Sequence, residues 1–366
     1  MSIGIYVHVP FCLTRCGYCD FNTYADLDDL KPRYVEALVE EAAIVAPSWN
    51  GDTVRSVFFG GGTPTTLRTS DLVRVLERLR GLFAISTDAE VTVEANPDTV
   101  DREKLARLRR AGVDRISIGA QSFDRAVLAS LERLHDPDAV RSAFEAARGA
   151  GYSNVNVDLI YGADGEGVAS WHRTLLEATA LEPEHISAYA LTVEPSTPLG
   201  RRVASGRVPP PDPDLQADMF STACDVLSDA GYGHYEVSNW ARPGRECRHN
   251  LGYWERRPYL GLGAGAHSFR DDRRWWNIRP PEQYMRRVEA GEPAMGGEER
   301  LEAPDVYLEE VFLRLRTRRG LPRGWFDPER VRPLVEGGLL GLEGDAVVPT
   351  ERGMALLNEV VLGLTS

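Results

Sequence analysis

Apolar positions follow two alternating patterns over about the first two thirds of the chain. Short runs rich in β-branched and aromatic residues alternate with longer segments whose apolar residues recur at helical spacing. The short runs predict six strands, at 3–9, 54–60, 90–96, 115–121, 155–162 and 185–193. The longer segments predict helices at 32–46, 70–83, 101–113, 137–151 and 167–182. Gly112 and Gly151 stand where two of these helices would end, as C-terminal glycines commonly do.

Strands that are buried on both faces and are each followed by a helix predict a parallel sheet with right-handed crossovers. Six such units predict an α/β fold, an incomplete TIM-like (β/α)6 barrel. A closed eight-unit barrel and a doubly wound open sheet are the alternatives. In barrels of this kind the functional residues gather at the C-terminal ends of the strands.

The pattern changes after residue 240, which divides the chain into three predicted parts. Residues 1–240 form the barrel, and residues 241–285, rich in Gly, Pro, Arg and Trp, form a connecting segment. Residues 286–366 form a small C-terminal domain of helices and one hairpin, whose turn is predicted at Gly344-Asp345. This helix-plus-hairpin module resembles a winged helix.

Composition restricts the class of protein. The chain has 366 residues, 43% of them hydrophobic and 27% charged, as in ordinary globular proteins. Its net charge of -13 argues against a general nucleic-acid-binding surface. Five cysteines without an even framework do not describe a secreted disulfide scaffold. No apolar run reaches the roughly 20 residues of a membrane span. We therefore expect a cytoplasmic protein that has no membrane span and binds no nucleic acid.

Three closely spaced cysteines carry the strongest chemical signal. Cys12, Cys16 and Cys19 form a CxxxCxxC triplet directly after the first predicted strand. A fully protein-ligated cluster or zinc site needs four ligands, and Asp20 and Phe21 supply no fourth cysteine. The spacing therefore predicts an iron–sulfur cluster with one iron left open for a small molecule. Three reduced structural cysteines are the alternative interpretation.

Further candidate residues follow the other predicted strands. The glycine-rich turn GGGTP, at 60–64, follows the second strand and lets a ligand approach the backbone closely. Glu94, Gln121 and Asp158 end the third, fourth and fifth strands, and Arg133 is expected on the helix after the fourth. These polar groups are candidates for binding hydroxyl, amino and carboxylate groups.

Taken together, these motifs resemble those of radical S-adenosylmethionine (SAM) proteins. Over essentially its whole length the chain is similar to oxygen-independent coproporphyrinogen III oxidases and their relatives, the HemW-type haem chaperones. The resemblance implies a [4Fe–4S] cluster on the three cysteines and SAM as a second cofactor. It also implies a SAM site, whose matching residues here are Tyr6, Tyr18, Gly61, Gly62, Thr63, Glu94, Gln121, Arg133 and Asp158, with Ala190 and His267 near two further contact positions.

Two differences from the oxidases favour the chaperone branch. The oxidases usually carry a further cysteine after the triplet and a long N-terminal extension, whereas Asp20-Phe21 follows here and five residues precede Tyr6. The chain also contains HNLGYW at 249–254, a pattern typical of the chaperones. A propionate-decarboxylating oxidase, or a radical SAM enzyme acting on another substrate, is the alternative.

The chaperone interpretation names a cargo and partners. Haem would be bound through the HNLGYW segment, by the imidazole of His249 and the flat rings of Tyr253 and Trp254, with His8 and His267 as competing ligands. A haem-accepting protein and an electron donor would be the partners. Cys224 is expected to pack as a small apolar residue. We expect the remaining histidines on helix surfaces or strand edges, namely His135, His172, His185 and His234.

Overall fold

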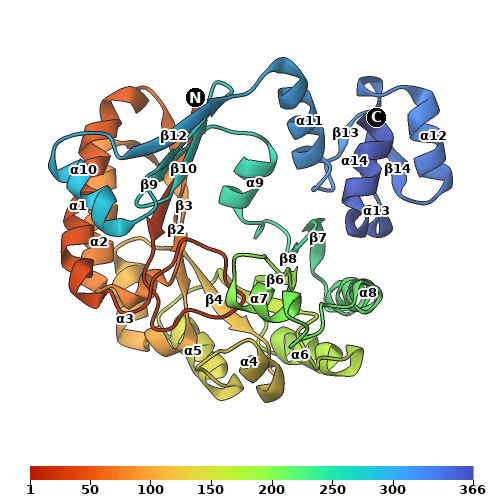
Figure 1. Ribbon diagram of the computed structural model, residues 1–366, viewed down its shortest axis with the longest axis horizontal. Helices are drawn as coiled ribbons and strands as arrows, with labels where there is room; N and C mark the ends of the chain where they lie inside the picture. The colour runs from red at the N-terminus through yellow and green to blue at the C-terminus, as the bar shows by residue number, and fades with distance from the viewer. Residues whose placement is uncertain (366) are drawn as a thin grey trace.

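The computed structural model describes residues 1–365. Glu94 and Gln121 stand at the C-terminal ends of two parallel strands, but Asp158 lies in the middle of another, so its predicted place at a strand end was wrong. Six parallel strands lie side by side in chain order (Figure 1). These strands are β1 (Ser2–Val9), β2 (Thr53–Gly61), β3 (Ala84–Ala95), β4 (Arg115–Gln121), β5 (Val155–Tyr161) and β6 (His185–Ala190). The predicted incomplete (β/α)6 barrel is therefore confirmed.

Helices follow the strands, as the 3.6-residue periodicity requires. They are α1 (Lys31–Val45), α2 (Thr69–Leu82), α3 (Arg102–Arg110), α4 (Arg125–Ser130), α5 (Pro137–Gly149) and α6 (Val168–Ala180). Gly112 and Gly151 have φ angles of 90°, so both glycines adopt the left-handed conformation after a helix, as predicted. The unit after β4 holds two helices, and Arg133 lies in the turn after α4, so its expected place on a helix was wrong.

Further strands extend this sheet at both edges: β9 pairs parallel with β1, whereas β10, β11 and β12 on that side, and β8 and β7 beside β6, are antiparallel to their neighbours. The sheet has twelve strands in the order β12-β11-β10-β9-β1-β2-β3-β4-β5-β6-β8-β7. Beyond β6 come α7 (Pro198–Ala204), α8 (Pro213–Asp229), β7 (Gly233–Glu236) and β8 (Asn239–Ala241). Beside β1 lie β9 (Tyr259–Leu262), β10 (His267–Arg270), β11 (Arg273–Asn277) and β12 (Met295–Arg300). In sequence, α9 (Arg248–Trp254) precedes β9, and α10 (Pro281–Glu289) lies between β11 and β12. Residues 241–285 thus contribute three strands, β9, β10 and β11, to the sheet.

The last segment of the chain packs around a core of its own. It comprises α11 (Ala303–Arg314), β13 (Leu321–Pro322), α12 (Pro328–Glu336), β14 (Leu340–Glu343), β15 (Ala346–Pro349), α13 (Glu351–Ala355) and α14 (Leu357–Thr365). β14 and β15 pair antiparallel across Gly344, whose φ is 60°, which confirms the predicted hairpin. Its buried residues, among them Val311, Leu315 and Val360, form a separate hydrophobic cluster. Figure 1 shows this unit beside β7 and α8, to one side of the barrel.

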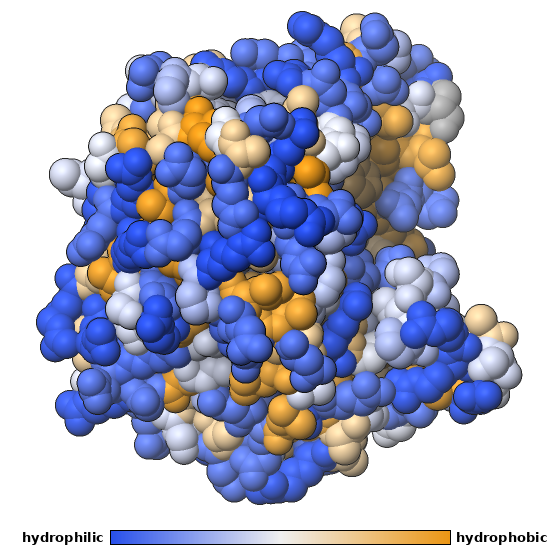
Figure 2. Space-filling view, turned by 60° about the vertical axis from the view of Figure 1, so that its left-hand side comes forward, coloured by the Kyte–Doolittle hydropathy of each residue, from blue (hydrophilic) through white to orange (hydrophobic). Residues whose placement is uncertain are grey.

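On the face shown in Figure 2 the surface is largely hydrophilic, and apolar residues appear there as small separate patches. No helix of residues 1–365 combines the length and the apolar character needed to cross a membrane.

Candidate functional site

A cavity of about 530 Å³ lies at the C-terminal ends of the parallel strands. It brings together most of the residues that the sequence predicted for the cluster and for SAM. Those that line it are Cys12, Cys16, Tyr18, Cys19, Gly61, Gly62, Thr63, Glu94, Gln121, Arg133, Asp158 and Ala190. Side chains from six successive strand ends meet there because the C-terminal ends of parallel strands share one edge of a sheet.

The glycine-rich turn supports the cysteine loop through its backbone. The Gly62 N–H donates to the Val9 carbonyl at 2.8 Å, and the Thr63 N–H donates to the Phe11 carbonyl at 2.8 Å. A Cβ atom at Gly62 would lie 2.7 Å from the Phe11 carbonyl oxygen, so only glycine allows this approach. The turn therefore holds the backbone immediately before Cys12 in place.

The three cysteines are free thiols, and one of them, Cys16, contacts a cationic group. Burial raises the pKa of Cys12 to about 11 and also raises the pKa of Cys19. The guanidinium Nη1 of Arg133 lies 3.4 Å from the sulfur of Cys16. The raised pKa favours the protonated thiol at Cys12 and Cys19, whereas a bound metal cluster would deprotonate both. Three sulfur donors in one open cavity fit a cluster that keeps one iron free.

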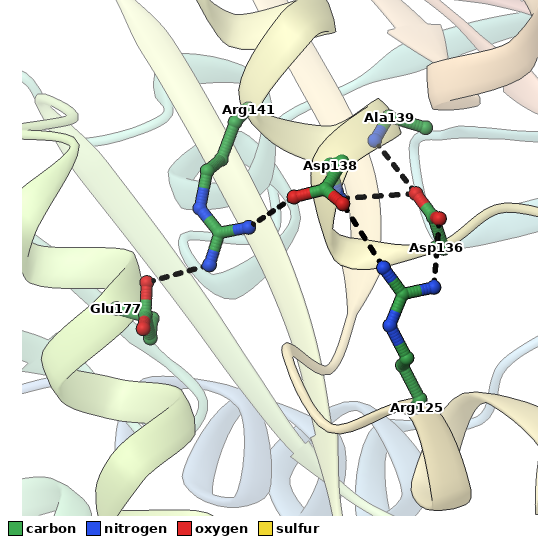
Figure 3. A network of polar contacts seen from close by, with 6 residues as sticks. All are labelled: Arg125, Asp136, Asp138, Ala139, Arg141 and Glu177. Atoms are coloured by element: carbon green, nitrogen blue, oxygen red, sulfur yellow. Dashed lines mark hydrogen bonds and ion pairs between the residues drawn. The ribbon is translucent and has the colours of Figure 1, made fainter.

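A network of ion pairs fixes the turn that carries Arg133 (Figure 3). Arg125 bridges Asp136 at 2.8 Å and Asp138 at 2.9 Å, across the turn between α4 and α5. Asp136 also caps α5, since its side chain accepts from the Asp138 and Ala139 N–H groups at 3.0 Å. Arg141 continues the network. Each exposed pair contributes about 0–1 kcal/mol, but together they define the path of the turn.

The guanidinium of Arg133 is directed into the cavity by neighbouring strand ends. Its Nη2 donates to Asn96 Oδ1 at 2.7 Å and to the Gly119 carbonyl at 3.3 Å. Asn96 was not predicted as a site residue, although it stands two residues after Glu94 at the end of β3. The period of two along a strand, which puts alternate residues on one face, was the signal that would have found it.

Two acidic side chains, those of Glu94 and Asp158, line the cavity. Glu94 accepts from the Gly61 N–H at 3.1 Å, and Asp158 accepts from Ser117 Oγ at 2.7 Å and Asn156 Nδ2 at 2.8 Å. Burial, together with the neighbouring charge of Asp158, raises the pKa of Glu94 to about 8, and burial likewise raises the pKa of Asp158. A cation placed between them would favour the ionised form of both.

Gln121 has an unusual backbone conformation at the edge of the cavity. Its φ is 64°, and the β4–β5 register shifts between Gly119 and Gln121. Left-handed conformations at non-glycine residues cost free energy and are concentrated at binding sites. A Cβ atom on Gly119 would lie 2.9 Å from Gln121 Nε2, so the side chain folds back over Gly119.

Tyr6 and His267 lie in a neighbouring cavity of about 370 Å³, which shares Asp20 and Phe21 with the cysteine-lined one. The hydroxyl of Tyr6 lies 3.0 Å from His8 Nδ1, while His267 is exposed and stacks on Trp276. His8 is buried, and burial lowers its pKa to about 4. The structure thus places these two predicted SAM contacts beside the main cavity.

The HNLGYW segment forms α9 at the opposite end of the sheet. Glu90 Oε1 accepts from the N–H groups of Arg248 at 3.0 Å and His249 at 3.3 Å, and His249 Nδ1 lies 2.9 Å from Ser56 Oγ. Ser56 stands near the start of β2 and Gly61 at its end. Five strand residues at about 3.3 Å each separate the two ends by roughly 16 Å.

Both ring nitrogens of His249 have partners. Nε2 lies 2.9 Å from the hydroxyl of Tyr253, and the imidazole is 4% exposed. Burial lowers the pKa of His249 to about 3, so the ring is neutral. Trp254 packs under the guanidinium of Arg316, 4.4 Å from the ring centroid. An iron could reach His249 Nε2 only by replacing the Tyr253 hydroxyl.

Two other histidines are not where they were expected. His135 and His185 are buried, and the ring of His185 contacts Asn156 Oδ1 at 2.6 Å and the Tyr235 hydroxyl at 2.7 Å. The expected positions on a helix surface or a strand edge were therefore wrong for both: His135 is in a turn, His185 begins β6 inside the sheet, and polar partners satisfy both rings. His172 is exposed on α6, as predicted.

Comparison with known proteins supplies independent information about this site. Residues 6–178 match the model of the radical SAM superfamily. The chain is 43% identical to a protein named heme chaperone HemW from Mycobacterium tuberculosis, over 98% of this chain and 93% of that protein. It is 34% identical to the protein of the same name from Bacillus subtilis, over 97% of both chains.

A solved structure shares the whole fold. The chain superposes on coproporphyrinogen III oxidase (HemN) from Escherichia coli, described as a radical SAM enzyme, with a TM-score of 0.85 and 25% sequence identity. The likeness covers 99% of this chain and 89% of that one. The predicted family resemblance is therefore confirmed.

Proposed function

The chain belongs to the HemW family of the radical SAM superfamily, and from this premise we propose that it binds a [4Fe–4S] cluster, SAM and haem and delivers haem to an acceptor protein. The observation that carries the proposal is the 43% identity to a HemW protein over 98% of this chain, together with the cavity lined by the three cysteines. Location in the cytoplasm remains part of the proposal.

Cys12, Cys16 and Cys19 would hold the cluster, and Arg133 would offset part of its negative charge. A reduced cluster of this type supplies one electron to bound SAM. The chain's own contribution is to bind and orient the cofactor. Glu94 and Asp158 would receive its cationic groups, and Gln121 would donate to it.

Haem is proposed to bind beside α9, where the structure offers cations for its propionates. A cavity of about 460 Å³ next to His249 is lined by Arg55, Arg248 and Arg257, and Tyr253 and Tyr259 supply aromatic faces. Guanidinium groups pair well with carboxylates. Replacement of the Tyr253 hydroxyl at Nε2 by the haem iron would complete the site. His267, exposed in the other cavity, is the competing ligand.

A haem titration of anaerobic, cluster-loaded protein tests this proposal. We expect a Soret shift in the wild type that His249→Ala removes and that His172→Ala, at an exposed helix position, leaves unchanged. Loss of the shift in His267→Ala, with His249→Ala unaffected, would move the ligand to the second cavity. Absence of any shift in the wild type would contradict haem binding.

The oxidase remains a second candidate because the fold superposes on coproporphyrinogen III oxidase along nearly its full length. Oxidase activity requires a propionate side chain to lose carbon dioxide, which an anaerobic assay with coproporphyrinogen, SAM and a reductant detects as protoporphyrinogen. We expect no product. Steady product formation would replace the chaperone proposal by the oxidase.

A further inference from the structure

A second group of metal-ligating side chains lies far from the cysteine-lined cavity, where the C-terminal unit meets the barrel. Cys224 stands on α8, His234 on β7, and Glu351 begins α13. Their ligand atoms all lie within 4.8 Å of one another. Three elements from two different parts of the chain therefore place a thiol, an imidazole and a carboxylate together.

The hydrogen bonds of His234 identify the nitrogen that faces the group. Nε2 lies 3.3 Å from the Val237 carbonyl, and because a carbonyl only accepts, Nε2 carries the proton. Nδ1, 4.0 Å from the sulfur of Cys224, is then the nitrogen with the free lone pair. The ring also stacks on Trp240 at 4.2 Å and 7°, which fixes its orientation. A metal-ligating histidine is usually held in this way, with its second nitrogen bonded to a carbonyl.

The carboxylate arrives from the C-terminal unit. Glu351 is exposed, and the Arg318 guanidinium contacts its Oε1 at 3.2 Å, so Oε2 can be presented to an ion. Thr350 caps α13 by accepting from the Gly353 N–H at 3.0 Å, and this fixes the backbone at Glu351. In tetrahedral zinc sites with ordinary bond lengths, sulfur and nitrogen ligands lie about 3.6 Å apart. The observed 4.0 Å needs only a small movement.

We propose that Cys224, His234 and Glu351 form a Zn²⁺ site that joins the barrel to the C-terminal unit. Thiolate and imidazole donors favour zinc over magnesium or calcium, which take oxygen ligands. Binding exchanges the thiol proton of Cys224, released to solvent, for a sulfur–zinc bond, while His234 already presents an unprotonated nitrogen. A water molecule completes the fourth position.

Such a site gives Cys224 a role beyond the apolar packing expected from the sequence. α8 and β7 belong to the barrel, whereas α13 follows the hairpin of the C-terminal unit, so the ion would fix the relative position of the two. The site shares no residue with the cysteine-lined cavity. Its loss should therefore leave SAM binding unchanged.

The test uses full-length, cluster-loaded protein under anaerobic conditions, with zinc chloride as the probe. We expect one zinc ion per chain in addition to the cluster iron, and X-ray absorption at the zinc edge should show a single sulfur ligand. Glu351→Gln, at an exposed position, should weaken zinc binding by at least about tenfold, since even outer-shell substitutions cost that much. Glu359→Gln, exposed on α14, is the matched control.

Cys224→Ser and His234→Asn should lower zinc affinity at least as much without changing the iron content. If Cys224→Ser does not fold, the zinc affinity of Glu351→Gln alone tests the proposal, because the side chain of Glu351 is exposed and its replacement should not disturb folding. A wild type that retains no zinc, or equal retention in Glu351→Gln and Glu359→Gln, would overturn the proposal. A zinc ion with three sulfur ligands would overturn it as well, since that ion would occupy the cluster cysteines.

Discussion

Proton release from Glu94 is the most direct test of the proposed SAM site. The pKa of this carboxyl is about 8, because of its burial and the nearby charge of Asp158. A group with this pKa is ionised to about 1% at pH 6 and about 50% at pH 8. SAM carries a sulfonium and an ammonium group, so bound SAM should favour the ionised form of the Glu94 carboxyl. Binding should therefore release a proton from Glu94 over this pH range.

The expected magnitude follows from the ionised fraction. If SAM binds only protein with ionised Glu94, the apparent Kd is the intrinsic Kd divided by that fraction, and affinity rises about 50-fold from pH 6 to pH 8. Glu94 is partly exposed to the cavity, where water can solvate its charge and reduce the effect of burial. We therefore expect the affinity for SAM to rise at least about tenfold from pH 6 to pH 8. The direction is fixed: lower pH weakens binding, because the proton competes with the cation.

Anaerobic calorimetry at pH 6, 7 and 8, in buffers of different ionisation enthalpy, measures both the affinity and the proton release. The α-amino group of SAM titrates in the same range, with a pKa near 8, so the Glu94→Gln variant is needed for comparison. It should bind more weakly at pH 8 and lose most of the pH dependence, whereas Glu103→Gln, exposed on α3, should behave as wild type. A wild-type Kd that is constant from pH 6 to 8, or an unchanged slope in Glu94→Gln, would refute the reasoning.

Three further predictions concern the cluster, the second carboxylate and the C-terminal core. Cys16→Ser should abolish the brown cluster chromophore, while Cys224→Ser should retain it with full iron content; a brown Cys16→Ser protein would contradict the assignment. Asp158→Asn should weaken SAM binding about tenfold or more by calorimetry, since a charged hydrogen bond contributes about 1.5–3 kcal/mol; unchanged affinity would place SAM elsewhere. Leu315→Ala, at a fully buried position, should lower the free energy of unfolding by about 2–5 kcal/mol in denaturant titrations, against about 0.5 kcal/mol or less for Leu308→Ala, at 46% exposure; equal losses would argue against the separate core.

The sequence predicted the parallel strands well because their burial on both faces leaves continuous apolar runs. It did not predict β9, because its four residues, YLGL, show no clear alternation of apolar and polar positions. This strand depends on pairing with β1, where Tyr259 lies opposite Gly4. A contact between residues so far apart in the chain overrides local preference, and no local pattern encodes it.

The cavity could be predicted to the extent that strand ends converge. Glu94, near the end of β3, and Asp158, in the middle of β5, both line it. The sequence could not predict that Arg133 reaches Asn96, because that contact depends on the path of a turn held by surface ion pairs. Nor could it predict the surroundings of His234, which depend on stacking against Trp240.

The open edge of the sheet has a mechanical consequence. In a closed barrel, strand number and stagger fix the diameter, because widening the mouth would break a ladder of hydrogen bonds. Here the outermost strands of the sheet, β12 and β7, do not pair with each other within residues 1–365. The curved sheet is therefore open rather than closed, and its two edges can move apart or together while every strand keeps its hydrogen-bonded neighbours. The distance between the two edges is therefore set by what packs between them, and a molecule or segment bound there would determine the width of the cavity.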